Sequence, residues 1–295
     1  MLRLDHVTKV FKGGTFGGAE ITAVSGVTFE IKPGEVVSLI GESGSGKTTV
    51  GRMILRLTEV TDGTITFEGQ DVTALGGRKL RGYYKHVQGV FQDPFSSYNP
   101  VFRVDRVFEM IRSIYLGDLS RTAWRAKLRA SLEAVALEPA DVLGKYPHQL
   151  SGGQLQRLLI ARALLLEIRF LVADEIISML DASTRIDVLN LLGDLKERGL
   201  GILFVTHDLS LGNYISDRAV ILRRGTVVEM GATEKVFSSP AHPYTKMLLA
   251  SVPQLHERWD GEQSAAADLA AAQLAKHTST GGALVEVEDN HFVAF

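Results

Sequence analysis

Gly41-Glu42-Ser43-Gly44-Ser45-Gly46-Lys47-Thr48-Thr49 is the stretch of this sequence that decides the fold. Residues 36–40 before it form an apolar run, and residues 50–55 after it continue as a helix would. A buried strand, a glycine-rich turn and a helix in this order are the setting in which the pattern G-x-x-x-x-G-K-[ST] predicts a phosphate-binding loop. A glycine-rich structural turn that binds nothing is the alternative, and the flanking strand and helix favour the phosphate loop.

The residue types in this stretch suit the phosphates of a nucleotide. Glycines let the backbone curl so that successive N–H groups point at one anion, and the start of the helix adds the positive end of its dipole. In such a loop Lys47 reaches the β- and γ-phosphates, and the Thr48 hydroxyl holds Mg²⁺. The sequence therefore predicts a nucleotide-phosphate site at residues 41–49.

Length and composition exclude several classes of protein. The 295 residues are 45% apolar, which is enough to bury a large core in one or two domains. The 32 basic and 34 acidic residues give a net charge of −2, so we expect no nucleic-acid partner. The sequence has no cysteine, which excludes disulfides, thiolate zinc sites and cysteine-held iron–sulfur clusters. Charged residues interrupt the most apolar region, 158–180, and no signal peptide is recognisable, so we expect a soluble cytosolic protein.

The patterns around the loop predict an α/β protein with a helical insertion. Alternating apolar and polar residues predict half-buried strands at 2–11, 21–31 and 63–68. Residues 93–150 show no strand pattern, and helical spacing recurs at 103–117 and 121–137. Phe11 stands at the end of the first strand, where it either stacks on a base or belongs to the core.

The second half of the chain returns to strands and ends in a different composition. Short apolar runs predict further strands at 87–91, 170–173, 202–206, 219–222 and 226–229, the last two as a hairpin. A helical extension is expected at 232–252. From residue 260 onward Ala, Ser, Thr and Gly dominate, which predicts a small helix at 264–275 and otherwise flexible chain.

Two carboxylates follow the strand at 170–173. This run is apolar throughout, as in a strand buried on both faces, and it delivers Asp174 and Glu175 at its carboxyl end. Ligands bind at that end of parallel sheets, and a buried carboxylate is costly without a partner. Mg²⁺ would compensate Asp174, and Glu175 would then polarise a water molecule. His207 closes the strand at 202–206, although a lone histidine is usually an ordinary residue.

A second candidate anion site begins at Ser151. Leu150-Ser151-Gly152-Gly153-Gln154 opens a strong helix that runs to residue 165, with Ser151 as its expected N-cap. The N–H groups at such a helix start can hold an anion. Ser-Gly-Gly alone is also a common loop, so this segment taken by itself is weak evidence.

In this order the motifs resemble those of the ATP-binding subunits of ABC transporters. Residues 41–49 are similar to the Walker A loop, Gln92 to the Q-loop glutamine, 150–154 to the signature, 170–175 to Walker B with its catalytic glutamate, 178–181 to the D-loop and His207 to the switch histidine. Phe11 falls where that family has its adenine-stacking aromatic residue. The likeness spans residues 1–235, and the combination of motifs is far more specific than any one of them.

The resemblance implies a fold and a domain division. The fold is a RecA-like P-loop nucleotide-binding core with N-terminal antiparallel strands, an inserted helical subdomain and a C-terminal extension. The ATP-binding domain would occupy residues 1–235, with the helical subdomain at about 93–157. Residues 236–295 would form a family-type extension that is partly flexible.

Within the family the chain looks most like importer subunits for oligopeptides and dipeptides. Residues 92–100, 242–245 and 286–294 carry this likeness. Related importers in that group carry oligosaccharides or nickel. The sequence departs from the family pattern in two places: Ile176-Ile177 replaces the usual Pro-Thr, and Met179 replaces the usual Ala of the D-loop. Both changes add apolar bulk and remove no catalytic group.

The resemblance also implies a mechanism and a set of partners. Two subunits, identical or sister ATPases, would sandwich two ATP molecules head to tail. Thr48, Gln92 and Asp174 would hold Mg²⁺, Glu175 would act as the base for the attacking water, and His207 would contact the γ-phosphate. Ser151 and Gly153 of the other subunit would cap the γ-phosphate, and Gln154 and Asp181 would also belong to the nucleotide-binding residues. Two membrane permease subunits, and indirectly an extracytoplasmic solute-binding protein, would be partners of a peripheral protein at the cytoplasmic face of the cell membrane.

An ABC-type ATPase of a non-transport complex is the alternative function. A DNA-repair ATPase would carry a long coiled coil where residues 93–150 lie, and no heptads occur there. A translation ATPase would carry two cassettes, and the sequence has one Walker A pattern. A subunit that only binds ATP would be expected to lack Glu175 or His207. ATP hydrolysis coupled to solute import is therefore the expected function.

Overall fold

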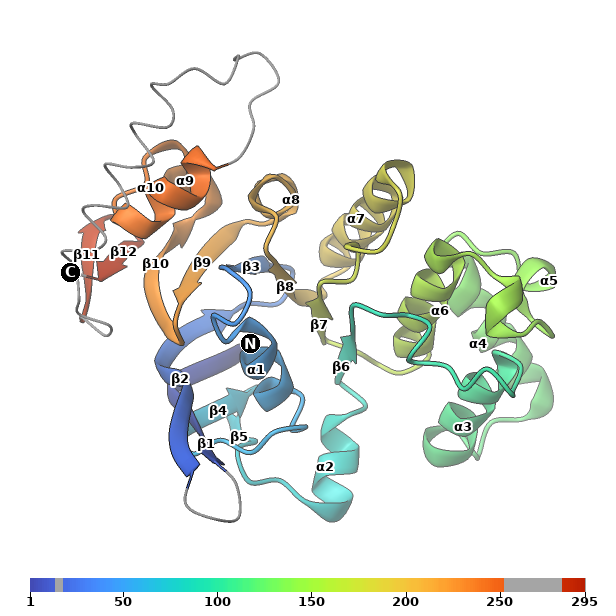
Figure 1. Ribbon diagram of the computed structural model, residues 1–295. Coiled ribbons are helices and arrows are strands. Elements are labelled where there is room, and N and C mark those ends of the chain that lie inside the picture. Colours follow the sequence, from blue (N-terminus) through green and yellow to red (C-terminus); the bar gives the residue numbers. More distant parts are fainter. Residues whose placement is uncertain (14–17, 252–282, 295) are drawn as a thin grey trace. The chain divides into compact units, whose positions relative to one another are not determined.

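The computed structural model describes residues 1–13, 18–251 and 283–294 (Figure 1). The described chain forms two compact units. One unit contains Met1–Ala74 and Ile202–Phe295, and the other contains Leu75–Gly201. Each unit is described by itself below.

The first unit begins with an antiparallel sheet. Its strands are β1 (Leu2–Gly13), β2 (Gly18–Ile31), β4 (Asp62–Phe67) and β5 (Gln70–Asp71), in the spatial order β2-β1-β4-β5. The alternation predicted for the first strand is present, since Leu2 and Leu4 are buried while Arg3 is exposed. The predicted N-terminal antiparallel strands are therefore confirmed.

A mixed sheet forms the centre of the first unit. Its strands are β3 (Val36–Ile40), β8 (Gly201–Thr206), β9 (Arg218–Arg223) and β10 (Thr226–Ala232). Strand β3 lies between β8 and β9 and is parallel to both, and β9 and β10 form an antiparallel hairpin. Every residue of β3 and β8 is buried, as expected for apolar runs in a parallel sheet covered on both faces.

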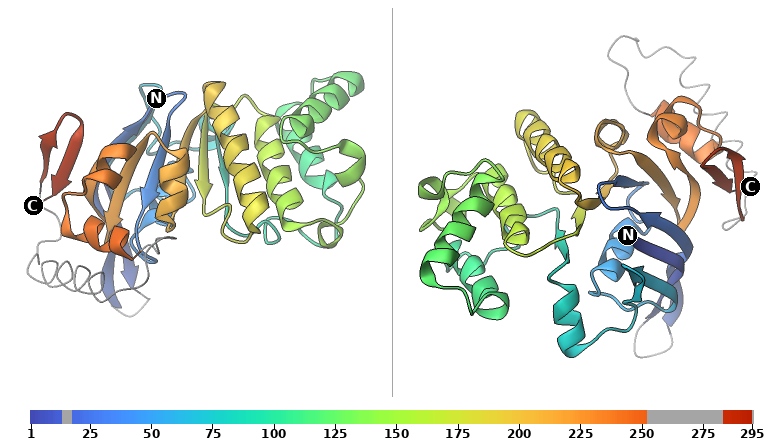
Figure 2. Two further views of the ribbon diagram at one scale, coloured as in Figure 1. Left: turned by 90° about the horizontal axis from the view of Figure 1, so that it is seen from above. Right: turned by 180° about the vertical axis from the view of Figure 1, so that it is seen from behind.

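The described part of the first unit contains four helices. They are α1 (Lys47–Ile54), α8 (Leu209–Ile215), α9 (Thr233–Ser238) and α10 (Pro243–Ala250). The last two lie beside β9 and β10 in both views of Figure 2. Buried side chains of these elements share one apolar cluster, which includes Ile40, Ile221, Val236 and Tyr244. The helical extension predicted at 232–252 is therefore packed against the sheet rather than apart from it.

The C-terminal tail adds a hairpin to the mixed sheet. Strands β11 (Leu284–Glu288) and β12 (His291–Ala294) pair antiparallel, and β12 also pairs with β10 (Figure 1). The expectation of flexible chain is therefore wrong for residues 284–294. The missed signal is local alternation in Leu284–Glu288 followed by a turn at Asn290, a residue type that tolerates its positive φ of 55°. The small helix predicted at 264–275 lies outside the described residues.

The second unit carries the helical insertion. Strands β6 (Val87–Val90) and β7 (Phe170–Asp174) are parallel to each other. The helices are α2 (Gly77–Tyr83), α3 (Asp105–Tyr115), α4 (Arg121–Glu133), α5 (Pro139–Val142), the short η1 (Pro147–Gln149), α6 (Gly152–Leu164) and α7 (Ala182–Glu197). Between β6 and β7, where every residue is described, the chain forms no strand, as predicted. Within the described ranges no helix is long and apolar enough to cross a membrane.

Candidate functional site

The phosphate loop, residues 41–49, follows β3 and includes the first residues of α1. Gly46 is the N-cap of α1 and has a φ of 104°, a conformation that glycine adopts without steric cost. A Cβ atom at this position would lie 2.5 Å from the carbonyl oxygen of Ala23 on β2. The loop therefore needs glycine here both for its conformation and for its close contact with β2.

The start of α1 is open to an anion. Among the described residues no side chain caps this helix, and its first turn has no acidic residue. The first N–H groups of a helix have no partner within the helix, and its dipole makes this end positive. The arrangement matches the expected phosphate site, since the N-terminus of a helix favours a negative charge.

Lys47 lies inside the loop that it helps to shape. Its side chain is 4% exposed, and Nζ donates to the carbonyl oxygens of Gly41 at 2.7 Å and Glu42 at 2.8 Å. A buried ammonium group is costly unless it is hydrogen-bonded, so these carbonyls stabilise the charge at this place. The cation therefore sits at the phosphate loop in the structure of the chain alone.

A hairpin turn braces the same loop. The Gly225 N–H, between β9 and β10, donates to the Ser45 oxygen at 2.8 Å, and the Ser25 N–H donates to the Gly225 oxygen at 2.8 Å. Gly225 has a φ of 84°, and a Cβ there would lie 2.7 Å from the Ala23 oxygen. The sequence predicted the hairpin of strands 219–222 and 226–229, but not its contact with the phosphate loop, because the two segments are far apart along the chain.

Phe11 is not part of the core. It lies on β1 with 43% of its surface exposed, and Lys9 Nζ lies 5.1 Å from the centre of its ring. Of the two interpretations of this residue, the exposed ring favours stacking on a base. That role stays a prediction.

His207 follows β8 in the same unit and is exposed. The next residue, Asp208, caps α8 by accepting the Leu211 N–H at 3.2 Å, and the Asp208 N–H donates to Thr206 Oγ1 at 3.0 Å. The turn that carries His207 is therefore fixed on its C-terminal side by hydrogen bonds.

In the second unit, β7 ends at the two predicted carboxylates. Asp174 is 5% exposed, and Glu175 has a φ of 51°, which is unusual for a residue with a side chain. The Glu175 carbonyl oxygen accepts the N–H of Ser178 at 3.2 Å and its hydroxyl at 2.9 Å, which holds the turn. An outlier of this kind, maintained by its surroundings, is typical of a functional site.

The departures from the family pattern lie next to this turn. Ile176 and Ile177 are 1% and 2% exposed, so they are core residues, whereas Met179 is 59% exposed. The added bulk of the two isoleucines therefore points into the unit. Met179 alone adds apolar surface on the outside.

The helix start at residue 151 is closed by its own side chains. Ser151 Oγ accepts the Gln154 N–H at 3.2 Å, and Gln154 Oε1 accepts the Ser151 N–H at 3.0 Å. These reciprocal bonds form a capping box, and they confirm the N-cap predicted at Ser151.

Thr184 brings two predicted site residues together. A Cβ at Gly153 would lie 2.4 Å from Thr184 Cγ2, so only glycine fits at this contact. Asp181 caps α7 by accepting the N–H and the hydroxyl of Thr184, at 3.0 and 2.8 Å, and the hydroxyl of Ser183 at 2.7 Å. These bonds, first of all the one from the Thr184 N–H, hold the pKa of the Asp181 carboxyl well below its usual range. Sequence reasoning missed Thr184.

Gln92 follows β6 and is exposed. The nearby strand is tied to α6, because the Arg162 guanidinium donates to the Gly89 oxygen at 2.8 Å. Burial lowers the pKa of Arg162 and raises the pKa of Tyr98, which is 4% exposed. In the segment 92–100, which carries the likeness to oligopeptide importers, Tyr98 is thus buried, while Asn99 and Pro100 are exposed.

The predicted site residues therefore fall into two groups. The phosphate loop, Phe11 and His207 belong to the first unit. Gln92, Asp174, Glu175 and the residues around the starts of α6 and α7 belong to the second.

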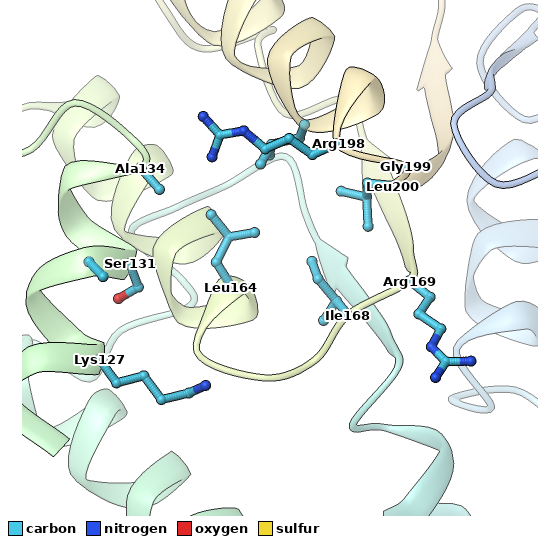
Figure 3. A pocket seen from close by; sticks show the side chains of 11 residues that line it. Lys127, Ser131, Ala134, Leu164, Ile168, Arg169, Arg198, Gly199 and Leu200 are labelled. Carbon is cyan, nitrogen blue, oxygen red and sulfur yellow. The ribbon is translucent and has the colours of Figure 1, made fainter. Parts of the chain in front are cut away.

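A separate cavity of about 450 Å³ lies within the second unit (Figure 3). Leu164 and Leu195 contribute to an apolar lining, and Lys127, Arg169 and Arg198 stand around it. The charged ends of these three side chains point in different directions in Figure 3, so they do not converge on one anion. None of the predicted site residues lines this cavity.

Comparison with known proteins gives matches over most of the chain. The family profile described as ABC transporter matches residues 24–178, and the profile described as oligopeptide/dipeptide transporter, C-terminal region, matches residues 228–279. The oligopeptide transport ATP-binding protein OppF of Streptococcus mutans is 41% identical over 255 residues, covering 86% of this chain and 82% of that protein. The glutathione import ATP-binding protein GsiA of Salmonella paratyphi A is 43% identical over 240 residues, covering 79% of this chain and 37% of that protein.

Among solved structures, the ATP-binding cassette MJ0796 has a similar fold. Its dimeric post-hydrolysis structure, bound to ADP and Pi, superposes with a TM-score of 0.70 and 31% identity. The match covers 79% of this chain and 99% of that one.

Proposed function

Because the chain belongs to the ABC transporter family of ATP-binding proteins, we propose that it powers the import of peptides or related small solutes. The fold is the ABC cassette fold, and the chain is an ATPase. ATP is hydrolysed to ADP and phosphate, and the released free energy is coupled to transport by partner subunits.

The phosphate loop is the observation that carries this proposal. Lys47 is already held against the carbonyls of Gly41 and Glu42, and α1 begins without a side-chain cap. We infer that the loop N–H groups and Lys47 hold the β- and γ-phosphates. The exposed ring of Phe11 would stack on the adenine.

Magnesium fits the donor set of the chain. Mg²⁺ prefers oxygen ligands, and it is usually bound by one or two carboxylates together with substrate phosphates. The carboxylate of Asp174, at the end of a buried strand, and the oxygens of Thr48 and Gln92 are of this kind. When bound, the ion would neutralise charge on the phosphates.

Glu175 is the proposed base. Its φ of 51° and the hydrogen bonds to its carbonyl oxygen fix the backbone at residue 175. The side chain therefore extends from a fixed position, as a base that positions a water molecule requires. His207 would donate a hydrogen bond to the γ-phosphate. Phosphoryl transfer depends mainly on positioning and charge stabilisation, so these groups suffice for the chemistry.

A head-to-tail dimer would give the start of α6 its role. The similar cassette MJ0796 is dimeric with ADP and Pi bound. In such a dimer Ser151, Gly153 and Gln154 of one subunit would face the γ-phosphate held by the phosphate loop of the other. Asp181 would stabilise the neighbouring turn by capping α7. The second subunit is either a copy of this chain or a sister ATPase.

The relatives support peptides as the transported solute. OppF is named for oligopeptide transport and GsiA for glutathione import, and glutathione is itself a small peptide. The match of residues 228–279 to the oligopeptide/dipeptide transporter C-terminal region points to the same group. Two permease subunits would carry the solute, a solute-binding protein outside the membrane would deliver it, and this chain would act at the cytoplasmic face.

Uptake of a labelled tripeptide tests this proposal, in cells that express the chain together with its partner subunits. Uptake should require the chain and should be lost with Glu175→Gln. The control Glu197→Gln changes an exposed carboxylate at the end of α7 and should retain uptake. Full uptake with Glu175→Gln would contradict the proposal. If the purified chain hydrolyses ATP but tripeptide uptake does not depend on it, the solute assignment fails and the ATPase assignment stands.

A further inference from the structure

One peptide group of the phosphate loop is held from both sides. The bond between Gly41 and Glu42 joins the Gly41 carbonyl, which accepts from Lys47 Nζ at 2.7 Å, to the Glu42 N–H, which donates to Tyr244 Oη at 3.1 Å. A peptide group is planar, so its carbonyl and N–H turn together. The tyrosine hydroxyl therefore fixes the orientation of the carbonyl that holds the ammonium group of Lys47.

Tyr244 is built into the first unit as a rigid element. It is 1% exposed and belongs to the apolar cluster that also contains Ile40, the last residue before the loop. The Arg223 guanidinium lies 5.4 Å from the centre of its ring. Burial raises the pKa of Tyr244, so its oxygen remains a neutral hydroxyl that accepts the Glu42 N–H.

The helix that carries Tyr244 is anchored at its start by a buried carboxylate. Glu229 on β10 is 0% exposed and accepts the N–H of Ala241 at 2.8 Å and of His242 at 3.0 Å. His242 caps α10 by accepting the Tyr244 N–H at 3.0 Å. His291 on β12 lies 2.7 Å from the same carboxylate through Nε2. The C-terminal hairpin, Glu229 and the start of α10 thus form one bonded group.

We propose that Tyr244, on the C-terminal extension, is a positioning residue for the phosphate loop, which it orients through the Gly41–Glu42 peptide. The inference rests on the proposed function, because it assigns Tyr244 an effect on nucleotide binding through Lys47. The extension is then part of the nucleotide site of this chain. Glu42 and Tyr244 are 202 positions apart in the sequence, so no local sequence pattern indicates their contact.

The test removes the hydroxyl and nothing else. Tyr244→Phe keeps the ring and its packing but leaves the Glu42 N–H without its acceptor. Affinity for the non-hydrolysable analogue AMP-PNP with Mg²⁺, measured by equilibrium titration of the full chain, should fall about two- to tenfold, the usual range for one lost hydrogen bond. Thr245→Val is the matched control. It removes the neighbouring buried hydroxyl, for which the described residues offer no hydrogen-bond partner, and should leave affinity unchanged.

A double variant separates positioning from general packing. If Tyr244 acts through Lys47, then Tyr244→Phe should change affinity by less than about twofold in a Lys47→Ala background, because the coupled partner is already absent. Equal losses in both backgrounds, a matching loss in Thr245→Val, or no loss in Tyr244→Phe would each overturn the inference. If Lys47→Ala itself leaves affinity unchanged, the phosphate-loop assignment fails as well. A loss in Lys47→Ala without one in Tyr244→Phe would overturn the role of Tyr244 alone.

Discussion

The helix starts of α1 and α6 are both predicted anion sites, and they differ in how their N–H groups are satisfied. At α1 the N-cap is Gly46, which offers no side chain, and Lys47 adds a buried positive charge beside it. At α6 the N-cap is Ser151. In its capping box the Ser151 hydroxyl oxygen accepts the Gln154 N–H, and the Gln154 side chain accepts the Ser151 N–H. We call the start of α1, whose N-cap has no side chain, the open start. We call the start of α6, which Ser151 and Gln154 cap, the closed start.

This difference indicates which start binds phosphate without help. An uncapped helix start with a neighbouring ammonium group is suited to hold an anion within one chain. A capped start is stable in the absence of a ligand, but the Ser151 hydroxyl still has its proton to donate. We expect α1 to supply most of the affinity for ATP and α6 to contribute when a second subunit brings it to the phosphates.

Stopping the chemistry should produce the largest effect. Glu175→Gln removes the proposed base, so hydrolysis should slow by about 10²–10⁴-fold while ATP still binds. If the two helix starts hold the same triphosphate, the dimer should then accumulate in ATP and be visible by size exclusion. Glu197→Gln, an exposed carboxylate on α7, serves as the control. Turnover near that of the unchanged chain would mean that another group activates the water.

Removing the charge at the open start should have the next largest effect. Lys47→Ala deletes charge-assisted hydrogen bonds worth about 1.5–3 kcal/mol, so the dissociation constant for ATP should rise about tenfold to a hundredfold. Titration with AMP-PNP measures this directly. Lys79→Ala changes an exposed lysine on α2 and should have no effect. An unchanged affinity in Lys47→Ala would remove the distinction between the two starts.

The same two regions show what could be predicted from the sequence. The phosphate loop and the cap at Ser151 are local patterns of residue type and spacing, and the structure contains both a glycine N-cap at Gly46 and the capping box. The contacts that brace them are not local. Gly225 reaches Ser45, and Tyr244 reaches Glu42, across long stretches of chain.

Thr184 and the tail hairpin illustrate the same limit. In the sequence Thr184 has no feature that marks it as a site residue. Its contact with Gly153 forms only because α7 packs against α6. The hairpin at 284–294 alternates in sequence, but its neighbour β10 can be identified only from the fold. Periodicity predicts an element, whereas its partners depend on tertiary packing.

Mixing two inactive variants tests whether the open and closed starts belong to one site. Lys47→Ala spoils the phosphate loop, and Ser151→Arg places a bulky cation at the start of α6. In a head-to-tail homodimer made from one of each, both defects fall in the same site and the other site is intact. ATPase activity of the mixture should therefore rise several-fold above either variant alone.

This mixing experiment requires that the chain form a dimer with itself. Size exclusion of Glu175→Gln must first show that the chain dimerises with itself. If the chain pairs with a sister ATPase instead, the two substitutions are divided between this chain and that subunit. No recovery in a proven homodimer would count against a shared site, since sites built within one chain would both stay broken.

The smallest expected effect concerns the closed start, and it separates capping from phosphate binding. Ser151→Ala and Ser120→Ala each remove a serine N-cap whose hydroxyl oxygen accepts an N–H at 3.2 Å, the first on α6 and the second on α4. Loss of such a cap costs about 1 kcal/mol, so each variant should lower the Tm by about 2–4 °C. Ser120 lies outside every predicted motif, and its variant should keep the ATPase rate of the unchanged chain. Ser151→Ala should also lower the ATPase rate, by about two- to tenfold, because it removes the proposed donor to the γ-phosphate along with the cap. Equal Tm losses with unequal ATPase rates would show that the Ser151 hydroxyl does more than cap its helix. Equal Tm losses with equal rates would assign Ser151 to capping alone and leave α1 as the phosphate-binding start of this chain.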